Sequence, residues 1–147
     1  MTKSTKSIIN IKDFFNETGK KKDLQVFYVI DEKSTMARLG KNPAGEVLLV
    51  SYPRIARTGK QDNPTYQSAI AIWVMEKALT GNITDDKEDE QYDRLLQKTF
   101  DVIDYMEDMA SEQPCSFAGT IKFETIEITP EYRTFGGYNG WVVEMII

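Results

Sequence analysis

Residues 66–77, Tyr66-Gln-Ser-Ala-Ile-Ala-Ile-Trp-Val-Met-Glu-Lys77, form the apolar segment on which the centre of any sheet in this chain depends. As a strand, the segment places Ile70 and Ile72 on one face and Trp73 and Met75 on the other, so both faces would be covered. As a helix, its alanines and its Met-Glu-Lys ending would also be acceptable. Periodicity cannot assign a two-sided apolar run, but the β-branched and aromatic residues favour the strand.

A long amphipathic helix is the clearest element and is expected over residues 86–112. Its apolar stripe recurs at helical spacing through Tyr92, Leu95, Leu96, Thr99, Val102, Ile103, Met106, Met109 and Ala110. Asp85 with Glu88 resembles a capping box at the start, and Pro114 marks the end. Residues 85–112 contain 11 acids and three bases, a net charge of −8, which leaves +3 for the rest of a chain whose total is −5.

A second helix is expected near the N-terminus, over residues 7–18. Its apolar side chains recur at helical spacing: Ile8, Ile11, Phe14 and Phe15. Gly19 follows as a helix stop. The three lysines at residues 20–22 continue past the end, where positive charge suits the helix dipole.

Four further segments have the composition of strands, because they are rich in β-branched and aromatic residues. They span residues 24–30, 46–52, 116–129 and 141–147. In the third of these, Ile121 and Phe123 share one face, whereas Ile126 and Ile128 are one position out of phase. A β-bulge near Thr125 would return both pairs to the core.

Three segments with glycine and proline breakers are expected to be loops: residues 31–45, with a possible helical turn at residues 35–39, residues 54–64 and residues 130–140. The resulting order of elements is α, β, β, β, α, β, β. It predicts one α+β domain over residues 1–147, built on an antiparallel, twisted sheet of about five strands. The N-terminal helix and the long amphipathic helix would pack on one face of that sheet.

The composition restricts the chemistry that the chain can perform. The sequence has no histidine and a single cysteine, Cys115, which excludes histidine general bases, Ser-His-Asp and Cys-His systems, and metal sites built on histidine or clustered cysteine. No convergent set of carboxylates, lysines or tyrosines is visible, so we expect no enzymatic activity, no cofactor and no metal. An enzyme that uses carboxylates and tyrosine is the alternative in this class.

The sequence also indicates where the protein works. It lacks the apolar core of a signal peptide and any run near the ~18 apolar residues that span a bilayer. We therefore expect synthesis in the cytoplasm and no membrane partner. The net charge of −5 and the pI of about 4.8 argue against a whole-protein attraction to nucleic acid, and no specific nucleic-acid partner is expected.

Arg54, Arg57 and Lys60 form a basic segment between Tyr52 and Tyr66. Such a segment can bind a protein partner, or it can be a solvated loop. A third use is contact with single-stranded nucleic acid, through base stacking on the tyrosines and charge pairing with phosphates.

Two other groups are candidate interaction residues. Asp101, Asp104 and Asp108 lie on the outward face of the long helix, either as a solvated stripe or as a docking site for a basic partner. The second group combines aromatic residues with an arginine, residue types that are enriched at protein interfaces: Tyr132, Arg133, Phe135 and Tyr138. Packing of the last hairpin against itself is an equal explanation of this group.

The element order and the last hairpin resemble the tail terminator and tail completion proteins of long-tailed bacteriophages. The similarity covers most of the chain. It comprises the N-terminal helix, the segments Leu48-Leu-Val-Ser-Tyr-Pro53 and Tyr66-Gln-Ser-Ala-Ile-Ala-Ile-Trp-Val74, the helix at residues 86–110, and Gly140-Trp-Val-Val-Glu-Met-Ile-Ile147. The sequence departs from the family in its loops at residues 31–45 and 54–64 and in its lysine-rich start. These departures leave open whether the chain is a terminator or another neck protein.

The resemblance implies a non-enzymatic virion subunit of the tail or neck region. Its partners would be copies of itself, in a ring that usually has six members, and the tail-tube and head-connector proteins. The ring would cap the tail tube, stop its growth and receive the head connector. No catalytic residues are carried over from the family.

The charge distribution is compatible with a ring. A head-to-tail interface joins two different surfaces of the same chain, and the acidic helix of one copy could face the basic segment of its neighbour. The alternative function is that of a small cytoplasmic adaptor or inhibitor that binds a partner protein through the acidic helix.

Overall fold

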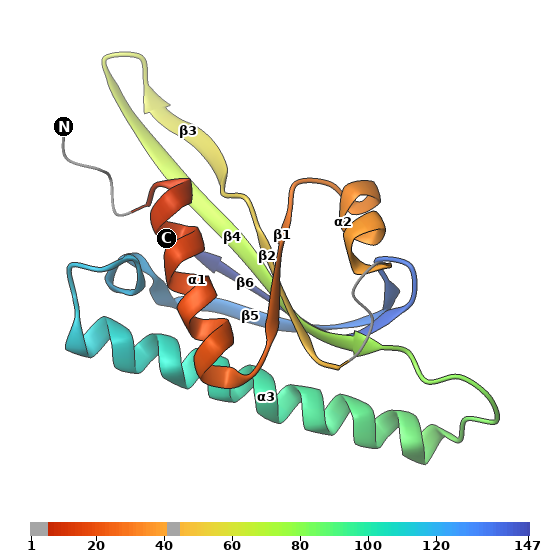
Figure 1. Cartoon of the computed structure of the whole chain (residues 1–147). Helices are drawn as coiled ribbons and strands as arrows, with labels where there is room; N and C mark the ends of the chain where they lie inside the picture. Colours follow the sequence, from red (N-terminus) through yellow and green to blue (C-terminus); the bar gives the residue numbers. More distant parts are fainter. Residues whose placement is uncertain (1–5, 41–44) are drawn as a thin grey trace.

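The computed structural model describes residues 6–40 and 45–147 (Figure 1). Within these ranges the elements follow in the order α1 (Ile8–Lys22), β1 (Gln25–Val29), α2 (Glu32–Leu39), β2 (Val47–Ser51), β3 (Arg54–Lys60), β4 (Asn63–Lys77), α3 (Asp85–Glu112), η1 (Phe117–Thr120), β5 (Lys122–Thr134) and β6 (Tyr138–Ile146). The strands form one sheet in the order β1-β2-β4-β6-β5, and β3 is a further partner of β4. The α+β class is confirmed. The described residues contain six strands rather than about five, and residues 41–44 of the first expected loop lie outside them.

β4 is the central strand, so the strand interpretation of residues 66–77 is confirmed. Ile72 pairs with Val50 of β2 on one side and with Val143 of β6 on the other, and both pairings are antiparallel. Ile72 and Val74 are fully buried on one face of the sheet and Met75 on the other. A strand that is paired on both edges and covered on both faces accounts for an apolar run without alternation.

The first two strands are parallel, so the expectation of a wholly antiparallel sheet is wrong for this pair. β1 and β2 are in register from Gln25 with Val47 to Val29 with Ser51. Parallel neighbours cannot be joined by a tight hairpin and require a crossover connection. α2 supplies this crossover.

α2 lies in the segment that was expected to be a loop with one helical turn. It is an eight-residue helix, capped by Asp31, whose carboxylate accepts the Ser34 N–H at 2.7 Å. Leu39 in its last turn is buried against the sheet. A polar helix of only eight residues is marginal in water by itself, so the burial of Leu39 stabilises it.

The main core lies between the sheet and the two helices α1 and α3. α1 contributes Ile11 and Phe15, and α3 contributes Leu95, Val102 and Met106. These side chains pack on the face of the sheet that carries the following residues: Leu48, Val50, Ile70, Ile72, Val74, Val143 and Met145. Both helices therefore cover one face, as expected.

The opposite face of the sheet has a smaller core. Leu39 of α2 packs there with Met75, Phe135 and Tyr138. The Trp73 ring meets the Phe135 ring edge-on at a centroid distance of 5.2 Å. α2 and the turn between β5 and β6 thus cover part of this face.

α1 ends four residues later than expected, because Gly19 does not end it. The helix begins after Ser7, whose hydroxyl accepts a backbone N–H of the first turn, and it ends at Lys22. The left-handed residue after the helix is Asp23, with φ 57°. Gly19 lies inside the helix, where a Cβ would collide with the Val26 side chain of β1, so the glycine permits a close approach of helix and strand.

α3 runs from Asp85 to Glu112, within one residue of the expected bounds. Its cap is Thr84, whose Oγ1 accepts the Lys87 N–H at 3.3 Å, rather than the expected pair of Asp85 and Glu88. In the described part of the chain, no helix has the length and apolar character needed to cross a membrane.

The β-bulge expected near Thr125 is confirmed. The register of β5 against β6 shifts between residues 122 and 127, and Thr125 Oγ1 accepts the Ile146 N–H at 3.0 Å. The long turn expected at residues 130–140 is wrong, because the two strands extend toward each other until only residues 135–137 connect them.

Candidate interaction surfaces

A two-stranded hairpin projects from the main sheet (Figure 1). Seven residue pairs join β3 to the outer half of β4. β6 pairs with β4 only as far as Ala69, and the Ile147 N–H donates to the Ser68 carbonyl at 2.9 Å. In the described ranges, β3 is consequently the one strand that pairs with residues 63–67. We call residues 54–69 the arm.

The loop expected over residues 54–64 is therefore wrong, since most of it is strand. Every residue of β3 is exposed, and so are the first five residues of β4. A strand shows alternating apolar and polar residues when one of its faces is buried. Neither face of the outer arm is buried, so its sequence has no such alternation. The arm is a strand pair because its backbone groups bond across the hairpin.

The arm brings together the basic and aromatic residues that the sequence singled out. Arg57 lies directly opposite Tyr66, and Ile55 shares their face because it is two residues from Arg57. The exposed fractions of Ile55 and Tyr66 are 61% and 66%. Arg54 and Lys60 lie on the other face of the strand pair, because each is an odd number of residues from Arg57. Ile55 was not predicted as an interaction residue, because it is a single apolar residue among basic and small ones.

The three predicted aspartates lie along the outward side of α3. Asp104 and Asp108 are exposed, whereas Asp101 is half-buried and accepts a hydrogen bond from Gln97 Nε2 at 3.3 Å. No lysine or arginine occurs between Lys98 and residue 122 in the sequence. The C-terminal half of α3 is thus a uniformly acidic surface.

The aromatic group of the last hairpin is divided by the structure. Phe135 and Tyr138 are buried in the smaller core, so they are not available as interface residues. Tyr132 is exposed, and its hydroxyl accepts a hydrogen bond from Arg133 Nε at 3.0 Å. The alternative of local hairpin packing is correct for the buried pair.

A groove of about 810 Å³ lies between α1 and α3. Its floor is aromatic, with the Phe14 ring centroid 5.4 Å from that of Phe117 and 6.2 Å from that of Tyr105. Glu17 and Glu112 line it, and burial together with these two carboxylates raises the pKa of Tyr105. We call this hollow the α1–α3 groove. The α1–α3 groove was not predicted from the sequence, because the residues that line it are far apart in the chain.

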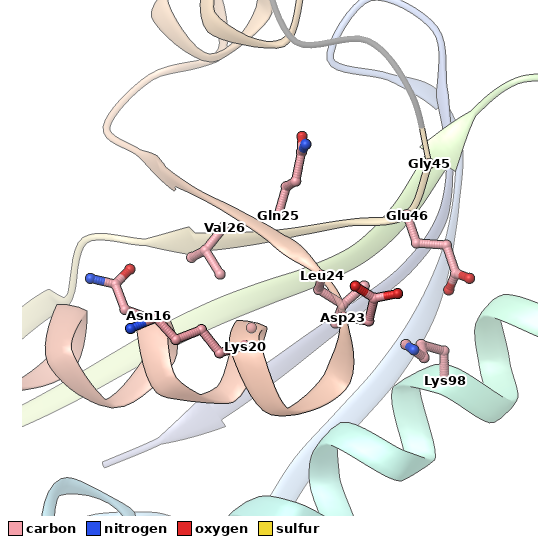
Figure 2. A pocket seen from close by; sticks show the side chains of 10 residues that line it. Asn16, Lys20, Asp23, Leu24, Gln25, Val26, Gly45, Glu46 and Lys98 are labelled. Atoms are coloured by element: carbon pink, nitrogen blue, oxygen red, sulfur yellow. The ribbon is translucent and has the colours of Figure 1, made fainter.

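A second hollow, of about 720 Å³, is polar (Figure 2). Figure 2 shows Asp23, Glu46 and Lys98 lying near one another, although they come from the end of α1, the start of β2 and α3. One oxygen of Glu46 is 3.5 Å from an Arg94 nitrogen, and the other is buried without a hydrogen-bond partner among the described residues. Charges of both signs meet here, so the hollow selects neither anions nor cations.

A partly buried polar network joins α3 to the end of β4 and the start of β6. Asn139 donates to Gln91 at 3.2 Å, and Gln91 donates to Glu76 at 3.0 Å. Arg94 binds both oxygens of Glu76, at 2.7 and 3.1 Å. Burial alone would raise the pKa of Glu76, but the hydrogen bonds from Arg94 and Gln91 and the charge of Arg94 outweigh it and hold the pKa below its ordinary value of 4.5.

This lowered pKa makes part of the stability depend on pH. A carboxylate whose pKa is lower in the folded state stabilises the fold above its unfolded pKa, and this stabilisation is lost as the pH falls through the folded pKa. We expect Glu76→Gln to unfold at lower urea concentration than the wild type near neutral pH, and the difference to shrink at about pH 3. A constant difference over that range, measured by urea unfolding with tryptophan fluorescence, would contradict the assignment.

Among residues 6–40 and 45–147, no three acidic or cysteine side chains gather into a group that could hold a metal ion. Comparison of the chain with family models, with curated proteins and with solved structures found no match. The surfaces described above and the pattern of elements are therefore the features from which a function can be inferred.

Proposed function

We propose that this chain is a non-enzymatic subunit of a bacteriophage virion, a tail terminator or tail completion protein that forms a ring at the head-proximal end of the tail tube. The observation that supports it best is the arm, a two-stranded projection with exposed apolar and basic side chains and no core of its own. Its partners would be copies of itself, usually six in the ring, and the tail-tube and head-connector proteins.

The arm is unfavourable as a free projection. An isolated two-stranded hairpin is at best marginally stable in water, and its open strand edges can pair with other chains. Ile55 and Tyr66 also expose apolar area on one face. Contact with a second molecule would order the arm and remove this area from water.

The charge distribution supports contact between copies. The arm carries Arg54, Arg57 and Lys60, whereas α3 carries 11 of the 23 acids of the chain and only three bases. Because the two surfaces differ, contact between them is head-to-tail and closes into a ring when the rotation per copy permits. The order of the elements resembles that of tail terminators, and this resemblance supports the same proposal.

Electron microscopy of the purified protein tests the proposal, together with its mass in solution measured by light scattering. We expect annular particles at low salt and a lower mean mass as the ionic strength rises, because salt screens exposed charge pairs. A monomer at low and high salt alike would contradict it.

Ile55→Asp is expected to reduce self-association by about tenfold or more, because it places a charge in the apolar contact. The free energy of unfolding should change by less than about 0.5 kcal/mol, since the side chain is exposed. Ile30→Asp is the matched control, because Ile30 has a similar exposed fraction, 63%, and lies outside the arm. Equal association of the two variants, measured by sedimentation, would argue against a contact through the arm.

The second candidate is an adaptor or inhibitor that binds a basic partner through α3. The exposed Asp104 and Asp108 favour it. Such an adaptor or inhibitor would work as a monomer or dimer and would form no ring at any of the salt concentrations above. Substitution of the two aspartates by asparagine would weaken its binding to the partner.

A further inference from the structure

We infer that the α1–α3 groove is the receptor for the arm of a second copy, with Ile55 and Tyr66 on its aromatic floor and Arg57 beside its carboxylates. The inference rests on the self-assembly proposed above and names the two surfaces that meet. Figure 1 shows the arm extending away from α3, so within the described residues the arm of one copy does not enter the groove of the same copy.

The groove has the chemistry of a receptor for an aromatic and basic segment. Phe14 and Tyr105 are half-buried at its floor, beside the buried Phe117, so they offer ring faces and edges to an incoming side chain. Tyrosine and arginine are the residues that most often anchor protein interfaces, in pockets of this kind.

The charges of the groove favour an arginine. Glu17 of α1 and Glu112 of α3 line the groove together with Tyr105. Lys20 lies 3.6 Å from Glu17, Lys21 also lines the groove, and Lys22 lies 5.7 Å from the centre of the Tyr105 ring. Glu112 has no ion pair among the described residues and continues the acidic surface of α3, so an arginine would form its charge-assisted hydrogen bonds with this carboxylate.

The arm has the complementary features on one face. Arg57 lies between the exposed Ile55 and Tyr66, and residues 53–61 contain no acid. The pairing of β3 with β4 places the three side chains on the same face, so one partner surface can contact all of them. Each copy would give its arm to one neighbour and its groove to the other, as a head-to-tail ring requires.

The single cysteine of the chain provides the first test. Cys115 is exposed and lines the groove, so a cysteine on the arm of a second copy should be within reach of it. Pro64 is exposed and lies two residues from Tyr66, so it is on the same face of the arm. We would mix Pro64→Cys/Cys115→Ser with the wild-type chain at low salt and add a short bismaleimide cross-linker. The expected product is a covalent heterodimer that peptide mass spectrometry assigns to positions 64 and 115.

Asp89→Cys/Cys115→Ser is the matched control, because Asp89 is exposed at the other end of α3. It should yield at least about tenfold less heterodimer under the same conditions. Equal cross-linking from both positions would overturn the inference, because the yield would then reflect random collision.

Exchange of charges provides the second test. Arg57→Glu and Glu112→Arg should each weaken association by about tenfold, and the double variant should recover most of the loss, because it restores an opposite-charge pair. Lys33→Glu, at an exposed lysine outside both surfaces, is the control and should not change association.

The two proposals fail in different ways. Rings that form without the cross-link and without recovery in the double variant would overturn the arm-in-groove contact and leave the assembly function standing. A monomer at every ionic strength would overturn both. Rings that show the selective cross-link and the recovery would support both.

Discussion

Gly140→Ala is expected to destabilise the protein by about 3 kcal/mol or more, the largest effect that we predict for adding one methyl group. Gly140 of β6 pairs with Met75 at the centre of the sheet. A Cβ at this position would collide with the Val74 carbonyl oxygen and lie 2.8 Å from Met75 Cα. These are backbone atoms of the central strand, so no rotation of a side chain relieves the collision.

Urea unfolding followed by circular dichroism measures this loss. Gly40→Ala is the matched control, because Gly40 has the right-handed helical φ of −62° and the nearest atom to an added Cβ is 3.4 Å away. The control should change the free energy of unfolding by less than about 0.5 kcal/mol. Similar midpoints for Gly140→Ala and the wild type would show that β4 and β6 are not packed as described.

Phe15→Ala is expected to cost about 3–5 kcal/mol, because it removes a fully buried ring and leaves a cavity. The Phe15 ring contacts Phe14 at 5.1 Å and Phe117 at 5.7 Å between centroids, so it joins α1 to η1. Loss of the ring should loosen α1 from the sheet and disturb the wall of the α1–α3 groove.

Thermal and urea unfolding test this expectation, with Ile9→Ala as the control on the same helix. Ile9 is 55% exposed, so its replacement creates no cavity, and alanine favours the helix. An equal loss in both variants would indicate that α1 does not pack through Phe15. Hydrogen exchange of the α1 amides in Phe15→Ala would locate the loosened region.

The elements that could be predicted are those whose side-chain pattern reports burial. The stripe of α3 has a period near 3.6 because one side of the helix faces the core. Residues 70–75 lack alternation because this part of β4 is covered on both faces, and the phase change around Thr125 marks a real bulge. Each of these patterns arises because side chains within one segment pack against the core.

The arm and the parallel pair could not be predicted in this way. Every residue of β3 faces water, so no alternation records its pairing with β4. The direction of β1 relative to β2 depends on the crossover through α2, a helix with two buried side chains, Thr35 and Leu39. Pairing of strands is a contact between distant segments, and a local pattern does not encode its direction.

The candidate interaction residues also differ in whether the local sequence could predict their role. Arg54, Arg57, Lys60 and Tyr66 were recognisable from their chemistry, because a cluster of basic and aromatic residues is local in the chain. The burial of Phe135, in contrast, follows from tertiary packing that no local pattern records.

Composition and local periodicity were enough to exclude histidine chemistry, to define the acidic helix and to assign the α+β class, since each depends on residues within one element. Folding alone joins Phe14, Tyr105 and Phe117 into a groove and holds the basic residues out on an arm. Long-range pairing of backbone and side chains creates these surfaces, and it links segments that are up to about a hundred residues apart in the chain.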